Sequence, residues 1–89
     1  MSEVTLKYPI KINGVEVKTL TFRRVTAGDR IRGTETCRGI TNEAELGLKL
    51  MRFLACATNQ EGLTPDSFDQ LDAEDHDSVV LAVSGQNPT

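Results

Sequence analysis

Three side chains in this chain could act as nucleophiles, bases or soft metal ligands: Cys37, Cys56 and His76. A structural zinc site usually takes four such ligands, and a disulfide framework needs more cysteines. We therefore expect both cysteines to be reduced thiols, and no metal or other cofactor to be bound. His76 lies between Asp75 and Asp77, but adjacent residues of a helix do not face one another, so this triplet predicts no acid–base pair.

A run of carboxylates in the last third of the chain could suggest calcium binding. The run consists of Asp66, Asp69, Asp72, Glu74, Asp75 and Asp77. It lacks the glycine turn and the closing bidentate glutamate of a calcium loop, so a solvated acidic helix face is the better interpretation. The glycines at positions 28, 33 and 39 are not spaced as a phosphate-binding or dinucleotide-binding loop. The sequence therefore gives no basis for an enzyme.

Charge is unevenly distributed along the chain, whose net charge is −3. Residues 1–52 contain all 10 basic residues and 6 acidic ones, whereas residues 53–89 contain 7 acidic residues and no basic one. The interpretation that we favour is that the two halves fold against each other with complementary fields. The alternative is that neighbouring subunits or a partner protein use these fields for orientation.

Five arginines in the first half could form a basic strip for nucleic acid. They are Arg23, Arg24, Arg30, Arg32 and Arg38. The acidic pI of about 5.0 and the presence of only 4 aromatic residues argue against such a surface. We expect these arginines to pair with Asp29, with Glu35 or with the acidic C-terminal half, and we do not expect nucleic-acid binding.

The chain length of 89 residues suits one small domain. We expect an α+β fold in which an antiparallel β-hairpin over residues 3–24 packs with a small bundle of three to four α-helices. The domain is expected to span residues 1–84, followed by a flexible tail over residues 85–89. No apolar run approaches the roughly 20 residues that span a bilayer, and the N-terminus lacks a signal-peptide pattern, so we expect a cytosolic protein and no membrane partner.

The hairpin is indicated by alternation and by its turn. Residues 4–12 alternate between apolar and polar types, as in a half-buried strand. Asn13-Gly14 predicts a two-residue turn, because both positions tolerate a positive φ. The apolar phase then changes in the returning strand, so we expect a β-bulge near Lys18 or Thr19.

This bulge fixes the expected pairing of the two strands. It would set Leu20 opposite Tyr8 and Phe22 opposite Leu6, with all four side chains on the core face. Pro9 has no N–H to donate to a ladder, so we expect its strand to present that position at an open edge.

Residues 42–58 predict the central helix of the fold, with Asn42 as its cap and Glu45 completing a capping box. One face carries a core stripe, namely Leu46, Leu50, Phe53, Leu54 and Ala57. We expect the hairpin to cover Leu46, Leu50, Phe53 and Ala57. The opposite side carries Leu48, Met51 and Ala55. A helix that is apolar on two sides needs cover on both, so these three residues are candidates for binding a partner protein. Burial in the core of this chain is the alternative for each of them.

Shorter helices are expected on either side of the central one. Thr26 with Asp29 predicts a helix start, and we expect a short helix within residues 30–40 that passes into a mobile loop. Thr64 predicts a further brief helix. The apolar residues 79–83 are compatible with a strand, but the cap signals before them favour a last helix.

The order of these motifs carries a family resemblance. The motifs are Pro9 and Gly14-Val15, then L-T-F-R-R with Arg23 and Arg24, then Gly28-Asp29, and last L-T-P-D to L-D over residues 63–72. In this order, over residues 3–84, the chain resembles the short tail assembly chaperones of long-tailed bacteriophages. The resemblance is to the contractile-tail type, which is encoded ahead of the tape measure protein.

The resemblance implies a non-enzymatic protein that binds the tape measure protein during tail assembly and keeps its long, apolar helical surface from aggregating. It implies release as tail tube subunits polymerise, and such proteins often have a longer form made by ribosomal frameshifting. The protein would then be phage or prophage encoded, present in the bacterial host cytoplasm and absent from the mature virion.

Two other functions compete with the chaperone interpretation. The first is a small structural tail or baseplate protein that is retained in the virion and adds its hairpin edge to a neighbouring sheet. A small nucleic-acid-binding regulator is the weaker alternative. Self-association into a homo-oligomer through the apolar side of the central helix is compatible with either of the first two functions.

Overall fold

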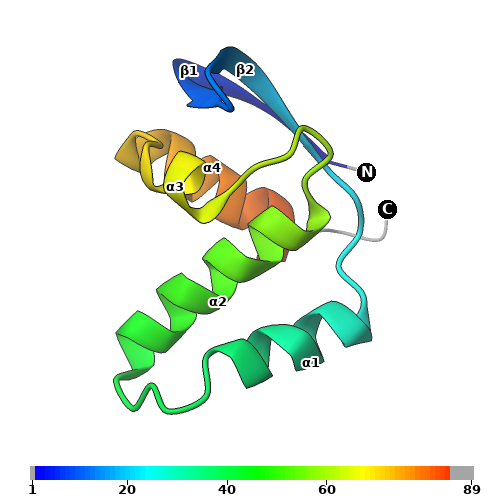
Figure 1. Ribbon diagram of the computed structural model, residues 1–89, viewed down its shortest axis with the longest axis vertical. Helices are drawn as coiled ribbons and strands as arrows, with labels where there is room; N and C mark the ends of the chain where they lie inside the picture. Colours follow the sequence, from blue (N-terminus) through cyan, green and yellow to red (C-terminus); the bar gives the residue numbers. More distant parts are fainter. Residues whose placement is uncertain (1, 85–89) are drawn as a thin grey trace.

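The computed structural model describes residues 2–84, which form two strands followed by four helices (Figure 1). The strands are β1 (Ser2–Ile12) and β2 (Val15–Phe22), and the helices are α1 (Ala27–Thr36), α2 (Glu43–Thr58), α3 (Pro65–Asp69) and α4 (Ala73–Ser84). The strands pair as an antiparallel two-stranded sheet, which confirms the predicted α+β class. The tail predicted over residues 85–89 lies outside the described residues.

The elements are stacked in the order hairpin, α3 with α4, α2 and α1, as Figure 1 shows from top to bottom. β1 packs on α4 and α3, both of these helices pack on α2, and α1 packs on another side of α2. The core lies between the hairpin, α4 and the C-terminal half of α2. Its most deeply buried apolar residues are Leu20, Phe22, Val79 and Ala55.

The core stripe that we predicted on α2 faces α1 more than the hairpin. α1 crosses α2 at Gly33, where an added Cβ would lie 2.6 Å from Cδ1 of Leu50 and 3.1 Å from Cδ1 of Phe53. Ala57, which we placed in the same stripe, is exposed. The expectation that the hairpin covers this stripe is therefore wrong, because α4 lies between the hairpin and most of α2.

The hairpin turn is as predicted, but the bulge is in the other strand. Asn13 and Gly14 have φ values of 53° and 79°, as a two-residue turn of this kind requires. Val4 pairs with Leu20 and Ser2 with Phe22, so residues 6–9 of β1 lie opposite the single residue Lys18. The extra residues lie in β1, and the pairing predicted for Leu20 and Phe22 is wrong, although both side chains are buried.

A carboxylate from α4 explains why β1 can leave the ladder. Pro9 has no N–H, and the backbone N–H groups of Lys7 and Tyr8 donate to Oδ1 and Oδ2 of Asp75, each at 3.0 Å. Asp75 is 3% exposed, so this buried acid is satisfied by two backbone donors. Tyr8, predicted on the core face, is instead 60% exposed because the bulge turns its side chain outward.

The edge of β1 that we expected to be open is occupied at two places. Besides the bonds to Asp75, the hydroxyl of Ser67 donates to the carbonyl oxygen of Lys11 at 3.0 Å, and the N–H of Lys11 donates to Oε1 of Gln70 at 3.4 Å. Side chains from α3 and α4 thus replace a neighbouring strand along part of this edge.

The predicted helix starts are confirmed in their positions. Thr26 and Asp29 form a reciprocal capping box at α1, and the Thr64 hydroxyl accepts from the N–H of Ser67 at α3. At α2 the Asn42 side chain accepts from the N–H of Glu45. The Glu45 carboxylate instead pairs with Lys49 at 3.0 Å, so only one half of the predicted capping box forms. The residues 79–83 are helical, within α4.

Candidate protein-binding groove

An apolar groove with a volume of about 810 Å³ lies between α4 and the N-terminal half of α2. Its apolar lining comes from Ala44, Gly47, Leu48 and Met51 of α2 and from Val80 and Leu81 of α4. We call this feature the α2/α4 groove. Such apolar concavities between helices are common binding sites for helices of other proteins.

The groove is open because α2 and α4 diverge. The two helices approach each other towards the C-terminal end of α2 and separate towards its N-terminal end (Figure 1). Where they approach, Leu54 and Val83 belong to the core and are each 2% exposed. Towards the N-terminal end of α2, Leu48 is 57% exposed, and Leu81, which is close to Val83 but on another face of α4, is 69% exposed. The rest of the described chain therefore leaves this part of both helices accessible.

The three residues that we predicted for partner binding do not share one environment. Leu48 and Met51 line the α2/α4 groove, and Met51 is partly buried against the edge of the core. Ala55 is 1% exposed and belongs to the core itself. Ala55 is therefore a core residue in this structure, which is the alternative that we stated for each of the three.

The α4 side of the groove was missed by sequence reasoning. Val79 and Val83, four residues apart, are 0% and 2% exposed, so they form the inner face of α4. Val80 and Leu81 then fall on other faces of the helix and line the groove. A signal was present, because five consecutive apolar residues on one helix cannot all face the same core.

The charged groups of the groove are mostly acidic. Glu43 at the start of α2 and Asp77 on α4 line it, together with His76, and no lysine or arginine does so. The Asp77 side chain is 81% exposed, and its Oδ1 lies 3.4 Å from Nδ1 of His76. The His76 ring packs edge-on against Phe68, with the ring centroids 5.4 Å apart. His76 thus connects the groove to the buried ring of Phe68.

Two charged residues of the family-like motif, Arg23 and Asp29, form an ion-paired cluster outside the groove, which we call the internal anchor. The side chain of Asp29 is fully buried. Its Oδ2 lies 2.8 Å from Nη1 of Arg23, and its Oδ1 lies 2.7 Å from Nη2 of Arg32. The Arg23 guanidinium, with help from the Thr26 N–H, holds the pKa of Asp29 well below its usual range. Arg23 also donates to the carbonyl oxygen of Ala57 at 3.2 Å, so the cluster joins the start of α1 to the end of α2.

The remaining motif residues have backbone roles or lie near this anchor. Gly28 leaves room for the side chain of Arg32, whose Nη1 would lie 3.3 Å from an added Cβ. Arg24 is exposed and offers its carbonyl oxygen to Arg23 at 3.0 Å. Pro9 lies in the β1 bulge and Gly14 in the hairpin turn.

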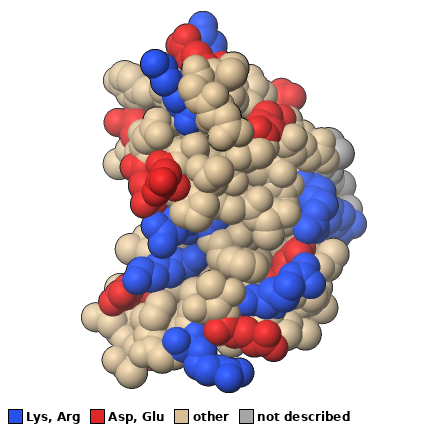
Figure 2. All heavy atoms as spheres, viewed as in Figure 1, with Lys and Arg blue, Asp and Glu red and all other residues tan. Residues whose placement is uncertain are grey.

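The arginines predicted as an alternative basic strip are interrupted by acids. Figure 2 shows positive side chains over α1 and α2 in the lower half of the view, interleaved with acidic ones. Arg23 and Arg32 both pair with Asp29, and Arg52 pairs with Asp69 at 2.9 Å. Of the five arginines in the predicted strip, Arg23 and Arg32 therefore pair as expected, whereas Arg24, Arg30 and Arg38 form no ion pair within residues 2–84.

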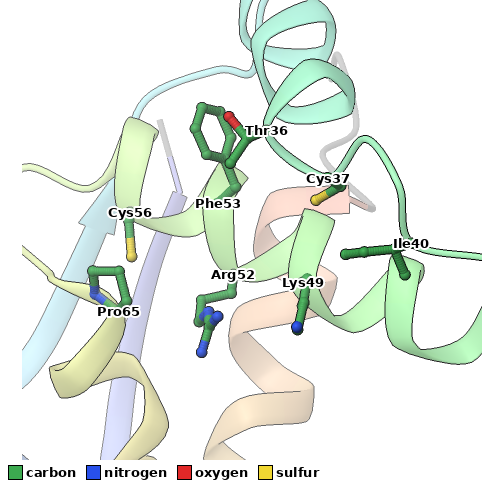
Figure 3. Close-up of a pocket in the computed structure, with 8 residues that line it drawn as sticks. All are labelled: Thr36, Cys37, Ile40, Lys49, Arg52, Phe53, Cys56 and Pro65. Carbon is green, nitrogen blue, oxygen red and sulfur yellow. The ribbon is translucent and has the colours of Figure 1, made fainter.

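A smaller pocket of about 320 Å³ is lined by both cysteines (Figure 3). It lies where α2 meets the end of α1 and the start of α3, and Lys49 and Arg52 also line it. Cys37 and Cys56 are free thiols. Burial raises the pKa of the Cys56 thiol to about 11, which keeps it in the unreactive protonated form near neutral pH.

Residues 2–84 contain neither a metal-ligand cluster nor a membrane-spanning helix. No group of three or more histidine, cysteine, aspartate or glutamate side chains in this part of the chain could hold a metal ion. None of the helices in the same range combines the length and the hydropathy that a membrane span needs.

Comparison with known protein families gives a match over most of the chain. The family model described as "Phage tail assembly chaperone proteins, E, or 41 or 14" matches residues 3–85, which is nearly the whole chain and includes both helices of the groove. No curated protein and no solved structure matches the chain.

Proposed function

The chain belongs to the family of phage tail assembly chaperones, and from this premise we propose that it binds the tape measure protein and keeps it soluble during tail assembly. The observation that carries the proposal is the α2/α4 groove. A long helical partner with exposed apolar side chains would aggregate on its own, and an open apolar groove can cover those side chains in turn.

The exposure of the groove residues supports this use. Leu48 and Leu81 come from different helices, yet both are more than half exposed and line the same concavity. Scattered single apolar residues on a surface need no explanation, whereas apolar residues gathered in one groove favour a binding function. Met51 adds an unbranched, adaptable side chain, which suits a surface that meets several similar helical segments.

The proposal includes the fate of the complex. The chaperone acts in the bacterial host cytoplasm, without catalysis, and leaves the tape measure protein when tail tube subunits polymerise around it. Mass spectrometry of purified mature particles should then detect the tape measure protein but not this chain. Recovery of the chain in particles at a fixed ratio to tail tube subunits would contradict release.

Co-expression with the tape measure protein tests the binding step. We expect the unmodified chain to keep the tape measure protein in the soluble fraction and to co-purify with it. Leu48→Asp and Leu81→Asp should each return most of the tape measure protein to the pellet, because a carboxylate in the groove opposes apolar contact. Ile31→Asp is the matched control, since Ile31 is 59% exposed but lies on α1.

The expected pattern is loss with both groove variants and retention with the control. Thermal unfolding of each purified variant shows whether its fold is intact. If folded Leu48→Asp and Leu81→Asp hold the tape measure protein as well as Ile31→Asp does, the groove is not the binding surface.

The alternative of a virion protein that adds its hairpin edge to a neighbouring sheet is less well supported. The N–H groups of Lys7 and Tyr8 are already bonded to Asp75, and Lys11 is bonded to Ser67 and Gln70. An incoming strand on β1 would have to displace these side chains.

A further inference from the structure

We propose that the α2/α4 groove selects a basic amphipathic helix, whose apolar stripe enters the groove and whose lysine or arginine side chains meet Glu43 and Asp77. This inference rests on the proposed function and specifies the chemistry of the bound segment. Three observations carry it, namely the charge of the groove, the glycine on its α2 side and its length.

Three carboxylates on α2, α3 and α4 are paired with a lysine or arginine, whereas within residues 2–84 the two in the groove, like Glu35 on α1 and Asp66 on α3, are not. Glu45 pairs with Lys49, Asp69 with Arg52 and Glu74 with Lys7, at 3.0, 2.9 and 2.8 Å. Within residues 2–84, neither Glu43 nor Asp77 forms an ion pair with a lysine or arginine, and Asp77 meets only His76. Two carboxylates that flank an apolar groove favour an occupant of opposite charge.

Gly47 lies in the groove without any role that the fold explains. It is in the middle of α2, where glycine weakens a helix. An added Cβ at Gly47 would meet no atom within 4 Å, whereas one at Gly33 would meet Leu50 at 2.6 Å. The packing of this chain therefore limits the size of the side chain at position 33 but leaves open space at position 47. An approaching helix backbone would account for Gly47, because a missing side chain permits close contact.

The length of the groove sets the size of the contact. From Glu43 to Met51 the helix rises by about 12 Å, or about two turns. A bound helix would present apolar side chains spaced three to four residues apart over the same distance, with its basic side chains on the flanks.

Two synthetic peptides provide the probes. Both are fluorescein-labelled helices of about 18 residues, or about five turns, with the same leucine and alanine stripe and with either lysine or glutamate at the other positions. In fluorescence anisotropy with the full chain at low salt, we expect the lysine peptide to bind at least about tenfold more tightly than the glutamate peptide. This preference should decrease at high salt because exposed charges are screened.

Variants of the chain assign this binding to the groove. Gly47→Leu should weaken binding of the lysine peptide about tenfold, because its Cβ would meet no atom of the fold and the rest of the side chain would occupy the groove. Asp77→Lys, alone and with Glu43→Lys, should remove the preference for the lysine peptide. The control Glu3→Lys with Glu16→Lys makes the same change of net charge on the exposed hairpin and should keep the preference.

The outcomes separate this inference from the proposed function. Equal binding of the two peptides, or an unchanged affinity with folded Gly47→Leu, would overturn the basic-helix inference even if the tape measure protein stays soluble. Tight, groove-dependent binding of the lysine peptide together with an insoluble tape measure protein would support the inference and contradict the proposed function. Self-association of the chain alone that Gly47→Leu abolishes would overturn the inference, since the occupant would then be a second copy.

Discussion

The two sides of α2 that meet α1 and α4 differ in how completely this chain covers them. On the α1 side, Gly33 lets the two helices cross so closely that the Leu50 and Phe53 side chains fill the space that a Cβ at position 33 would take. On the α4 side, the helices diverge, and Leu48 and Leu81 remain more than half exposed in a groove. An apolar helix face can be buried by its own chain or stay exposed for a partner protein. The residue types on the face do not show which of the two applies.

The largest expected effect comes from closing the glycine contact on the α1 side. Gly33→Val should lower the free energy of unfolding by about 2–3 kcal/mol, because the Leu50 side chain can rotate aside but the Phe53 ring behind it limits further movement. Chemical denaturation followed by circular dichroism measures this change. Gly47→Val is the matched control and should change stability far less, since its Cβ meets nothing. Equal losses for the two variants would remove the distinction between the two sides.

The next effect concerns the buried acid that anchors α1. Asp29→Asn should lower the free energy of unfolding at pH 7 by about 1–2 kcal/mol, because the capping bond and the charged bonds to Arg23 and Arg32 are weakened. Denaturant titrations of the two proteins at neutral pH measure this difference.

The same variant carries a prediction for acid. The folded state lowers the pKa of Asp29 from its ordinary value, so the stability that Asp29 contributes is present above about pH 4 and is lost as the pH falls below it. Asp29→Asn should therefore lose less stability than the unmodified chain over this acid range. Parallel acid profiles for both proteins would show that the anchor contributes little.

A smaller effect of opposite sign is expected at the open side. Gly47→Ala should raise the free energy of unfolding by about 0.5–1 kcal/mol, because alanine favours a helix and its methyl group meets no neighbour. Gly39→Ala provides the contrast, since Gly39 has a φ of 94°, and alanine there should be destabilising. A loss of stability with Gly47→Ala would mean that the fold itself needs this glycine.

The smallest expected effect on stability comes from the groove residue with the largest expected effect on binding. Leu48→Asp should change the free energy of unfolding by no more than about 0.5 kcal/mol, because its side chain is largely exposed. Thermal and chemical unfolding of the purified variant check this value. A large loss of stability would mean that Leu48 belongs to the core and that the α4 side of α2 is not left exposed.

Much of the fold was predictable because local residue patterns specify it. The turn at Asn13-Gly14, the caps at Thr26 and Thr64 and the helical state of residues 79–83 are set by residues within a few positions of one another. The position of the bulge was not predictable in this way. It depends on Asp75, which bonds the N–H of Lys7 from 68 positions away in the sequence.

The sequence predicted the α2 side of the candidate groove but not its α4 side. Helical periodicity places Leu48 and Met51 on a side of α2 away from its main stripe, but it also places Ala55 there, and Ala55 is buried by α4. Periodicity around one helix gives the direction of each side chain. It does not give the angle at which a second helix crosses, and that angle decides where cover ends.

Local sequence patterns therefore specify most elements of this protein and their order, and they carry the resemblance of its motifs to the tail assembly chaperones. Only the tertiary structure decided that Asp29 and Asp75 are buried anchors, that Gly33 is a crossing point and that the α2/α4 groove is open. The difference arises from the sequence separation over which the interactions act. Turn and cap preferences act between near neighbours, whereas burial depends on side chains that are distant in sequence and meet only when the helices have packed.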